Sequence, residues 1–595
     1  MPTPTTPSPG ESPGTSLPTV TTSRAVLARR RFLAGGGALV AGAVTLAACD
    51  NGSGEEGMET PSTDAEGPTG PEVVIDEFQD YSGDHTLWQV RYELGDDEES
   101  PELFDATTQA ARHEALQAKK EEQEWTAAEP LLVMDPYGTT SSGLYLYFSD
   151  AAPGEVEVTA QVAATEDFTA TIANQADTGF EGLAIAMVPG AINELTLRWR
   201  PEGGDEVASA MRIKTPEAAT GYGTVLDTQI EDAEAISPGL FALSGISGPG
   251  NASFLYDGTG TMRAEIPSGD SPQHRVRLQE GNLVVTTGSR QVSVLDALGH
   301  AGTIIDLGDQ SVHHDLEVVD GIAYVLTSKV GNERVEDRVI RVDLASGQVD
   351  EVVDLQTVFP AYEEIAHARE GGEAGGSAVK GKDWIHINSI DITDGVMVLS
   401  ARETSTIIAL DGALEPGGEP SVRWLIGGEV LWEGTGYEEH FLAAEGDPNG
   451  NAGQHTVHRI DDDSLDEGQF YLEMFNNNHW YLGTRDAEVW EGKGPANASE
   501  SEFDGVSQVL RYLVDENAGT YSEDLMVEIP YSSVVSSVQR LGDGGVDQPM
   551  VVNSGKANEF SERTAEGELV AAYRYDSSNF GYRVYKDSFE GFWYA

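Results

Sequence analysis

The stretch VMVLSARETSTIIALDG, residues 396–412, contains the pattern that decides the fold. An apolar run, a short polar turn and a second apolar run that closes on Asp-Gly predict two neighbouring antiparallel strands. Comparable pairs of runs recur along the chain at 240–260, 283–299, 323–347, 470–519 and 549–576. Six copies of one unit predict radial repetition of four-stranded sheets, because a single such sheet cannot bury both of its faces. We therefore expect residues 217–595 to form a six-bladed β-propeller.

The chain before these repeats has a different pattern. Residues 130–216 contain short apolar runs, such as GLYLYFSD and ELTLRWR, separated by turn residues, and this spacing predicts a β-sandwich. Residues 73–129 form an N-terminal extension in which 102–125 alternates charges and predicts one exposed helix. The expected fold class is all-β, a six-bladed β-propeller with an N-terminal β-sandwich domain.

The N-terminus is predicted to be an export signal. Arg29 and Arg30 precede Phe32-Leu33 and a weakly apolar stretch, which fits the twin-arginine pattern. The stretch ends in Leu-Ala-Ala-Cys49, a lipobox, and its Gly and Ala content is marginal for a membrane span. We expect residues 1–49 to be a lipoprotein signal peptide and the polar residues 50–72 a disordered linker. The protein would then be exported and anchored through a lipid on Cys49, on the outer side of the cytoplasmic membrane.

Composition narrows the possible partners. The chain has 101 acidic and 35 basic residues and a formal net charge of −66 at pH 7. Nucleic acid is not an expected partner, because phosphate binding needs clustered Lys and Arg. Cys49 is the only cysteine, so the mature protein has neither a disulfide nor a site built from several thiolates.

Histidines are concentrated in one part of the chain: ten of the 12 lie between His274 and His479. His314 (or its neighbour His313), His386 and His455 precede or begin runs at comparable places in three repeats, and Arg402 follows in the hairpin after His386. Since the innermost strand of each propeller blade lines the channel, we expect these side chains to meet at one channel mouth. His458 lies three residues after His455 and is predicted to point to the opposite face of the strand.

Three imidazoles and a guanidinium suit a tetrahedral oxyanion such as sulfate or phosphate, and one imidazole can be a nucleophile toward it. A zinc or copper site is the rival interpretation, because three His can bind Zn²⁺. Against it, Arg402 would oppose a cation, and no HExxH spacing is present. We expect neither a metal nor a cofactor.

Several blocks resemble the bacterial arylsulfate sulfotransferases. They are HHDL, DWIHINSID with the following LSARETSTIIALD, and GQHTVHRI, in that order along the chain. DPYGTTSSGLYLYF, SSVQRLGDGG and FGYRVYK agree with the same family, so the resemblance covers roughly 130–590. It implies a six-bladed propeller with an N-terminal β-sandwich that moves a sulfuryl group from a phenolic sulfate ester to a phenol, without a nucleotide donor.

The resemblance also implies roles for single residues. His455 takes the place of the histidine that becomes transiently sulfated, and His386 and Arg402 match the residues that hold the sulfuryl oxygens. The HHD block supplies a further histidine, for which we choose His314. Glu403 and Thr404 depart from the family pattern after the arginine, and this puts the acceptor preference in doubt.

Other readings of the sequence stay open. A lipid-anchored propeller could bind anionic or sulfated aromatic ligands without turnover, although His455 argues for chemistry. A quinone-dependent dehydrogenase would need a stacking Trp repeat, which the sequence lacks. The sequence does not separate sulfotransfer from hydrolysis by water, and it leaves a homodimer open.

Overall fold

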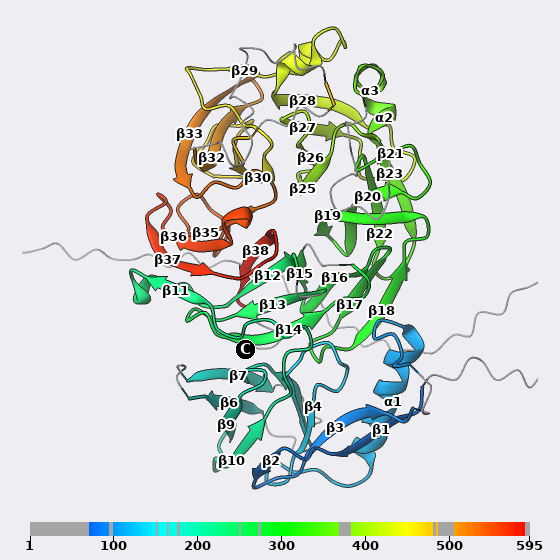
Figure 1. The fold of residues 1–595 in the computed structure, drawn as a ribbon, viewed down its shortest axis with the longest axis vertical. Helices are drawn as coiled ribbons and strands as arrows, with labels where there is room; N and C mark the ends of the chain where they lie inside the picture. The colour runs from blue at the N-terminus through cyan, green and yellow to red at the C-terminus, as the bar shows by residue number, and fades with distance from the viewer. Residues whose placement is uncertain are drawn as a thin grey trace, which may run out of the picture. The chain divides into compact units, whose positions relative to one another are not determined.

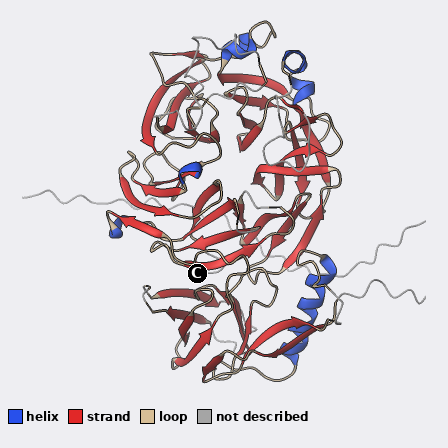
Figure 2. Cartoon of the chain, in the orientation of Figure 1, coloured by secondary structure: helices blue, strands red, loops and turns tan. Residues whose placement is uncertain are grey.

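The computed structural model describes residues 71–589, except 95–98, 150–152, 164, 166, 175–178, 249–250, 272–274, 368–381, 480–483 and 486–504. The predicted signal peptide, with Arg29, Arg30 and Cys49, lies outside the described residues, as does nearly all of the predicted linker. Strands dominate the described residues, so the predicted all-β class is confirmed (Figure 2). None of the helices in these ranges has the length and apolar character needed to cross a membrane.

Two five-stranded sheets contain the N-terminal strands (Figure 1). The first has the order β1 (Val73–Glu77), β3 (Leu87–Tyr92), β4 (Leu131–Met134), β5 (Leu144–Phe148) and β8 (Phe180–Ala184). The second has the order β2 (Tyr81–Gly83), β10 (Val207–Lys214), β9 (Ile192–Pro201), β6 (Gly154–Gln161) and β7 (Phe168–Asn174). Alternate residues of β6 are buried, and Val158 and Leu197 of this sheet share a core with Leu132 and Leu146 of the first.

The predicted helix is present as α1 (Ala106–Glu121), and it is shorter than the predicted segment. The Asp105 side chain accepts hydrogen bonds from the amides of Thr107 and Thr108, which caps the N-terminus. The prediction that this helix is exposed is wrong, because one face is buried. Leu116 packs into the apolar core, and Arg112 donates to the carbonyl of Pro136 at 2.9 Å.

From β11 (Asp227–Ile230) onward, the described strands form six sheets of four or five strands and one short parallel pair, β21 (Arg334–Val335) with β24 (Lys382–Asp383). Three of these sheets are β14 (Met262–Pro267), β13 (Ala252–Tyr256), β12 (Leu240–Ile246), β38 (Gly581–Asp587); β15 (Val276–Gln279), β16 (Asn282–Gly288), β17 (Gln291–Leu295), β18 (Ala301–Asp306); and β19 (Gln310–Val319), β20 (Ile322–Lys329), β22 (Arg338–Asp343), β23 (Val349–Asp354). The other three are β25 (Ile387–Thr393), β26 (Val396–Ala401), β27 (Thr406–Asp411), β28 (Ser421–Gly427); β30 (His455–Ile460), β31 (Gln469–Asn476), β32 (Ser507–Asp515), β33 (Thr520–Ile529), β29 (Ala443–Ala444); and β34 (Ser537–Arg540), β35 (Met550–Ser554), β36 (Glu559–Arg563), β37 (Leu569–Arg574), β11.

Short helices occur only in connections among the described residues. They are α2 (Leu355–Val358), α3 (Pro360–Ile365) and the 3₁₀ turns Ala233–Ala235, Glu429–Trp432, Glu438–His440 and Gly555–Ala557.

One edge strand of each of these six sheets contacts the corresponding strand of the next sheet. We call these six strands, β15, β19, β25, β30, β34 and β38, the first strands, although β38 comes last in the chain. β15 touches β19, β19 touches β25, β25 touches β30, β30 touches β34, and β34 touches β38. Strands from the two ends of this region also pair across the sequence, since β38 lies beside β12 and β11 lies beside β37 (Figure 1). No sheet closes on itself in the described chain. The residues that precede or begin these first strands are therefore brought together.

Candidate active site

The same irregularity occurs near the start of three first strands. The strand pairing shifts by a β-bulge between Val312 and Leu316 in β19, between Ile387 and Ser389 in β25, and between His455 and His458 in β30. At or beside each bulge one residue has a left-handed backbone: His314 (φ 55°), His386 (φ 54°) and Thr456 (φ 53°). A bulge bends the strand and re-aims a side chain, so the three bulges set the direction of the predicted histidines.

His314, His386 and Arg402 meet as the sequence predicts. The rings of His314 and His386 lie 4.8 Å apart, centroid to centroid. The Arg402 amide donates to the carbonyl of His386 at 3.0 Å, and Arg402 Nη2 lies 3.0 Å from His386 Nδ1. The ring of Tyr582 connects this group to His455, because its centroid lies 5.4 Å from His314 and 6.3 Å from His455.

The hydrogen bonds of His455 define which nitrogen carries its proton. Nδ1 lies 2.7 Å from Asn477 Oδ1 and 3.0 Å from the carbonyl of Gly453, so Nδ1 is the donor. The Asn477 amide nitrogen donates to two other carbonyls, which fixes the orientation of that side chain. Nε2 therefore has the lone pair, and it accepts a long hydrogen bond of 3.2 Å from the amide of Val535.

The surroundings of His455 keep its ring neutral. Burial and the nearby positive charge of Arg402 hold the pKa of His455 well below its usual range, and this outweighs the hydrogen bond that Nδ1–H donates to Asn477. His455 is almost completely buried. A neutral imidazole with its lone pair on Nε2 is the form that can attack an electrophile.

A layer of buried amides and hydroxyls fixes the backbone before His455. The carbonyl of Gln454 accepts hydrogen bonds from Asn388 Nδ2 and Ser400 Oγ, both at 2.9 Å. The Gln454 side chain returns a hydrogen bond to Ser400 Oγ at 3.1 Å, and Asn451 donates to its amide oxygen at 2.9 Å. The Gln-His block is therefore fastened to the sheet that carries His386 and Arg402.

Three buried carboxylates surround His386, and of these only Glu403 was singled out from the sequence, for its departure from the family pattern. Glu336 Oε2 lies 3.2 Å from His314 Nε2 and in very close contact with His386 Nδ1. Asp383 Oδ2 lies 2.9 Å from the same Nδ1, and Glu403 Oε1 accepts from Arg402 Nη2 at 2.8 Å. The only sequence signals were Asp383 three residues before His386 and Glu403 directly after Arg402. Nothing in the sequence marks Glu336.

The carboxylates change the protonation of His386. Burial and the charge of Arg402 lower its pKa, but Asp383 and Glu336 outweigh both and raise the pKa of His386 to about 9. The same imidazole, together with His314, holds the pKa of Glu336 well below its usual range in spite of burial. Without further ligands, the site at neutral pH therefore contains two cations, His386 and Arg402, beside a neutral His455.

The choice between His313 and His314 has a geometric basis. His314 contacts His386, Glu336 and Tyr582, whereas the His313 ring lies 4.9 Å from that of His314. Burial and neighbouring His314 lower the pKa of His313 to about 3, so His313 stays neutral. His314 is the histidine that belongs to the cluster around His386.

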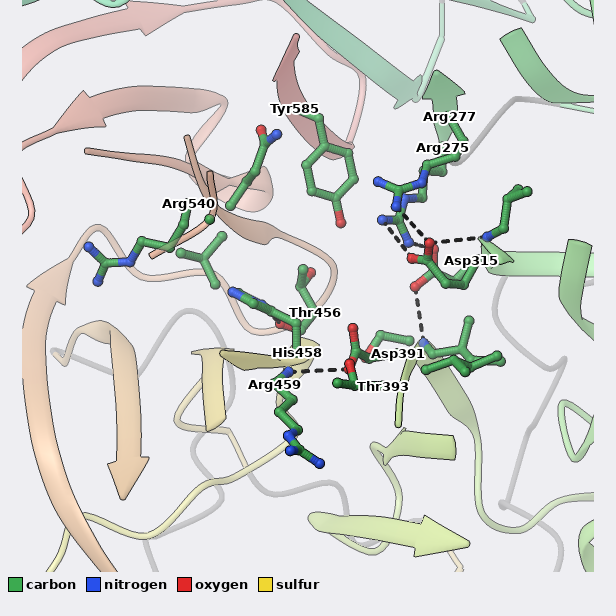
Figure 3. Close-up of a pocket in the computed structure, with 18 of the residues that line it drawn as sticks. Arg275, Arg277, Asp315, Asp391, Thr393, Thr456, His458, Arg459, Arg540 and Tyr585 are labelled. Atoms are coloured by element: carbon green, nitrogen blue, oxygen red, sulfur yellow. Dashed lines mark hydrogen bonds and ion pairs between the residues drawn. The ribbon is translucent and has the colours of Figure 1, made fainter. Parts of the chain in front are cut away.

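A cavity of about 820 Å³ lies further along the first strands, and Figure 3 shows Arg275, Asp391, His458, Arg540 and Tyr585 around it. None of the four predicted site residues lines this cavity, although residues that closely follow the three histidines in sequence do. It is therefore a neighbour of the candidate site and not the site itself.

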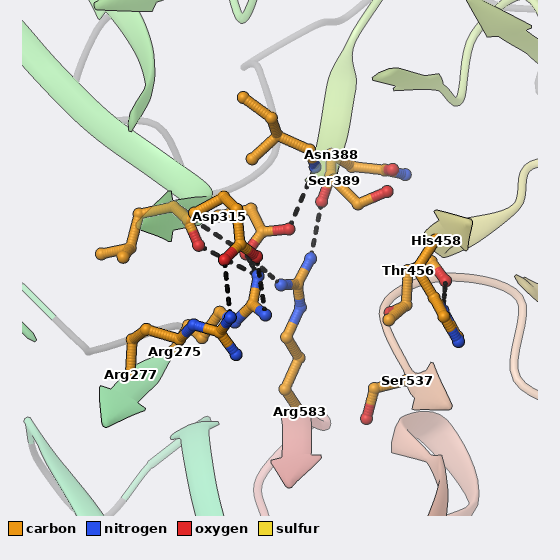
Figure 4. Close-up of polar contacts among 12 residues, drawn as sticks. Arg275, Arg277, Asp315, Asn388, Ser389, Thr456, His458, Ser537 and Arg583 are labelled. Atoms are coloured by element: carbon orange, nitrogen blue, oxygen red, sulfur yellow. Dashed lines mark hydrogen bonds and ion pairs between the residues drawn. The ribbon is translucent and has the colours of Figure 1, made fainter. Parts of the chain in front are cut away.

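The carboxylate that directly follows His314 marks the edge of this cavity. In Figure 4, Asp315 lies between Arg275, at 3.1 Å, and Arg583, at 2.5 Å, and Arg583 also donates to the carbonyl of Asn388 at 2.7 Å. Asp315 also lines a hollow of about 10 Å³ next to His314, which has room for roughly one water molecule.

The predicted orientation of His458 is wrong. Across the bulge, His455 pairs with Phe475 and His458 pairs with Glu473, two residues apart on β31, so both histidines lie on one face of the sheet. The bulge adds one residue and cancels the expected alternation. The environments still differ, because His458 lines the cavity and lies 3.7 Å from Glu473.

One comparison with known proteins covers the part of the chain that contains this site. A family model described as Arylsulfotransferase (ASST) matches residues 227–584, more than half of the chain and the part that contains all four predicted site residues. No curated protein sequence matches this chain.

Solved structures resemble it only distantly. A protein of unknown function from Bacteroides caccae has 11% identity and a TM-score of 0.32, over 58% of this chain and 98% of that one. A periplasmic gluconolactonase of Pseudomonas aeruginosa has 10% identity and a TM-score of 0.30, over 73% of this chain and 99% of that one. On the family match, the chain belongs to the arylsulfotransferase family and is a sulfotransferase, a transferase enzyme.

Proposed function

We propose that this enzyme moves a sulfuryl group from a phenolic sulfate ester to a phenolic acceptor through a sulfated His455. The observation that carries the proposal is the state of this ring: neutral, buried, and with its lone pair on Nε2. Nε2 attacks the sulfur, the bond from sulfur to the phenolic oxygen breaks, and the electron pair leaves with the phenolate. In the second step an acceptor phenol gives its proton to His386, its oxygen attacks the sulfur, and the N–S bond breaks with its electron pair returning to Nε2. This sequence is a ping-pong exchange.

The neighbouring charges support the first step. Protonated His386 and Arg402 can hold the sulfuryl oxygens as negative charge shifts during transfer. The His386 proton can also pass to the leaving phenolate, which needs a general acid. Nδ1–H of His455 keeps its hydrogen bond to Asn477 while Nε2 forms the new bond, so the ring does not have to change its tautomer.

The loop that contains Val535 has to yield for this attack. The amide of Val535 donates a hydrogen bond to His455 Nε2, the atom that has to attack. Val535 (φ 55°) and Ser536 (φ 92°) both have backbone conformations that non-glycine residues rarely adopt. Backbone strain of this kind occurs preferentially at active sites and switch segments, where the surrounding structure holds it. Arrival of the donor would exchange the amide of Val535 for the sulfur atom.

The decisive experiment exposes the protein to a chromogenic aryl sulfate without acceptor and measures its intact mass. We expect one phenolate released and one sulfuryl group gained per chain, with the group on His455, labile in acid and discharged by added phenol. His455→Asn should lose both the adduct and all transfer, while His458→Asn, changed in the same way in the cavity, should keep both. Phenolate release without acceptor that continues beyond one equivalent would instead indicate hydrolysis. Retention of the ester without any release would indicate a binding protein.

We propose further that the six sheets of residues 217–595 form a six-bladed β-propeller and that residues 130–216 form a β-sandwich. The consecutive contacts of the first strands and the shared core of the two N-terminal sheets support this arrangement. An experimental structure that placed another sheet between two consecutive first strands would contradict it.

Export with a lipid anchor is the third part of the proposal and rests on Arg29, Arg30 and Cys49. Replacing both arginines with Lys should trap the precursor in the cytoplasm, and Cys49→Ala should release the exported protein from membranes. Membrane association that survives Cys49→Ala would identify the apolar stretch itself as the anchor.

A further inference from the structure

Three buried carboxylates crowd the ring of His386. Glu336 and Asp383 both contact its Nδ1, and Glu403 lies beside Arg402. Arg402 is matched by Glu403, because Nη2 lies 2.8 Å from Glu403 Oε1. Glu336 and Asp383 share the ring of His386, and Asp383 also lies 3.5 Å from Arg402 Nη2. A buried carboxylate that lacks compensation is costly, and a sulfuryl group would add further negative charge.

Hydrogen bonding around the same atoms is incomplete. Glu336 Oε1, Asp383 Oδ1, Glu403 Oε2 and His386 Nε2 are buried, and none has a hydrogen-bond partner among the described residues. The atoms that do have neighbours share too few hydrogens. Glu336 Oε2, Asp383 Oδ2 and Arg402 Nη2 all lie close to the single atom His386 Nδ1, which can carry only one hydrogen. Buried polar atoms without partners are costly, and a bound ion is one way to satisfy them.

We propose that His314, Glu336 and His386 bind one divalent transition-metal cation beside the sulfuryl site. These residues can each offer one ligand atom, and the three atoms lie within 4.8 Å of one another. His314 Nε2 and Glu336 Oε2 are 3.2 Å apart, close to the roughly 3.3 Å between ligands that bind tetrahedral Zn²⁺ at about 2.0–2.1 Å. Two imidazoles and a carboxylate form a common donor set for Zn²⁺ and Fe²⁺, with at least one position left open.

The guanidinium of Arg402 does not exclude this cation. In the sequence Arg402 stands as a positive charge that would oppose a cation, but in the structure it is paired with Glu403 at 2.8 Å. Asp383 Oδ2 lies 2.9 Å from the same Nδ1 that Glu336 contacts, so its carboxylate adds negative charge beside the cation. With the metal bound, His386 has no proton to give to the leaving phenolate, and the cation takes over the stabilisation of negative charge at this point of the site.

The cation would also have a task in sulfuryl transfer. Its open position lies in the cluster that adjoins Arg402, so it can take a sulfuryl oxygen and offset the carboxylates there. This role rests on the proposed function, whereas the metal site itself does not.

The test measures metal binding without any aryl sulfate. The full exported chain is stripped with a chelator, its fold is checked by circular dichroism, and Zn²⁺ is titrated in by calorimetry. Co²⁺ serves as a spectroscopic probe, since its visible absorption reports the coordination geometry. We expect one site per chain, a Co²⁺ spectrum with nitrogen and oxygen ligands, and a loss of affinity of about 100-fold or more in Glu336→Gln.

Asp337→Asn is the matched control. It removes a buried carboxylate from the next position, where Asp337 Oδ2 accepts a hydrogen bond from Trp384 Nε1 at 2.9 Å, and it should keep the Zn²⁺ affinity. A folded wild-type chain that takes up neither Zn²⁺ nor Co²⁺ overturns the inference, as does Glu336→Gln with unchanged affinity. If Glu336→Gln does not fold, His314→Asn makes the same test.

The metal site and the proposed function fail in different ways. A metal-free chain that still forms sulfated His455 removes the metal and keeps the reaction. A chain that binds Zn²⁺ and never gains a sulfuryl group keeps the metal and removes the reaction.

Discussion

Arg402 is the residue whose charge reaches every part of the candidate site. It lies 3.0 Å from His386 Nδ1 and 2.8 Å from Glu403, and it lowers the pKa of His455. Arg402→Ala should lower kcat by about 10²–10³-fold, the usual cost of losing one donor to a developing charge. Slow formation of sulfated His455 should survive, because Arg402 forms no bond to sulfur.

A control distinguishes the loss of the Arg402 charge from a general loss of stability in Arg402→Ala. Arg402→Ala leaves Glu403 buried without its partner, so the double variant with Glu403→Gln should recover the thermal stability but not the turnover. Arg423→Ala removes an exposed arginine paired with Glu516 and should leave kcat unchanged. Recovery of kcat in the double variant would mean that Arg402 acts through the fold alone.

Asp391 gives the stability a dependence on pH. Burial and the negative charge of Glu317 raise the pKa of Asp391 from 3.8 to about 7. Between these two values the folded protein holds a proton that the unfolded chain has released. Since the unfolded state then binds fewer protons, this group makes the unfolding free energy fall as pH rises from about 4 to 7.

Chemical denaturation at pH 5 and pH 8 measures the effect. Asp391→Asn should reduce the difference in unfolding free energy between the two pH values. Asp394→Asn, which changes an exposed carboxylate in an ion pair with Arg459, should keep the wild-type difference. An unchanged difference in Asp391→Asn would assign the pH dependence to other groups.

The sequence predicted the histidines and the arginine of the site because repeats place equivalent residues at equivalent points. It did not predict Glu336, which comes from the β20–β22 connection, or Asn477, which follows β31. Their roles depend on the bulges and on contacts between sheets, which no local pattern encodes. The orientation of His458 failed for the same reason: a single left-handed residue, Thr456, changes the register.

At the scale of single elements, strands of apolar sequence were predicted well, whereas strands of polar sequence were missed. In most repeats the two predicted runs correspond to the second and third strands of a sheet, as in β26 and β27. In the last repeat the third strand, β36, has the sequence EFSER and was missed, so the second predicted run is the fourth strand, β37. Helix α1 was found from its composition, but its buried face was not, because polar residues such as Arg112 cover part of it.

One buried ion pair joins two neighbouring elements. Glu473 of β31 accepts hydrogen bonds from Arg540 of β34, from Nε at 2.9 Å and from Nη2 at 2.5 Å, and both side chains are nearly inaccessible to solvent. Removing one partner leaves a buried charge, so Arg540→Ala should lower the unfolding free energy by about 3–5 kcal/mol. Urea denaturation measures this change.

Two comparisons make the prediction specific. Arg574→Ala breaks a half-exposed pair with Glu559 and should cost about 0–1 kcal/mol. The double variant Glu473→Leu with Arg540→Met should be more stable than Arg540→Ala, because no charge stays buried without a partner. Equal losses in the half-exposed and buried pairs would contradict the role assigned to burial.

At the scale of the whole molecule, the repeats indicate how many sheets to expect but not how the chain ends are used. The last strand, β38, joins the first repeat, and β11 joins the last sheet. These pairings link residues more than three hundred positions apart, and no periodicity in the sequence specifies such partners. The family resemblance predicted the propeller and its site, whereas the pairing of the two ends had to come from the structure.

The pairing of β38 with β12 predicts what happens when the end of the chain is removed. A chain that stops after Asp576 lacks β38, so β12 loses its ladder from Leu240–Asp587 to Ile246–Gly581 and becomes an open edge. The deletion also removes Tyr582, which contacts the rings of His314 and His455, and Arg583, which pairs with Asp315. We expect this variant to lose cooperative unfolding and to aggregate, and a chain that stops after Phe589 to behave like wild type. Thermal unfolding followed by circular dichroism, with light scattering, distinguishes the two. If the shorter chain kept a cooperative transition at the wild-type temperature, the contacts among the first strands would hold the sheets together without closure by β38.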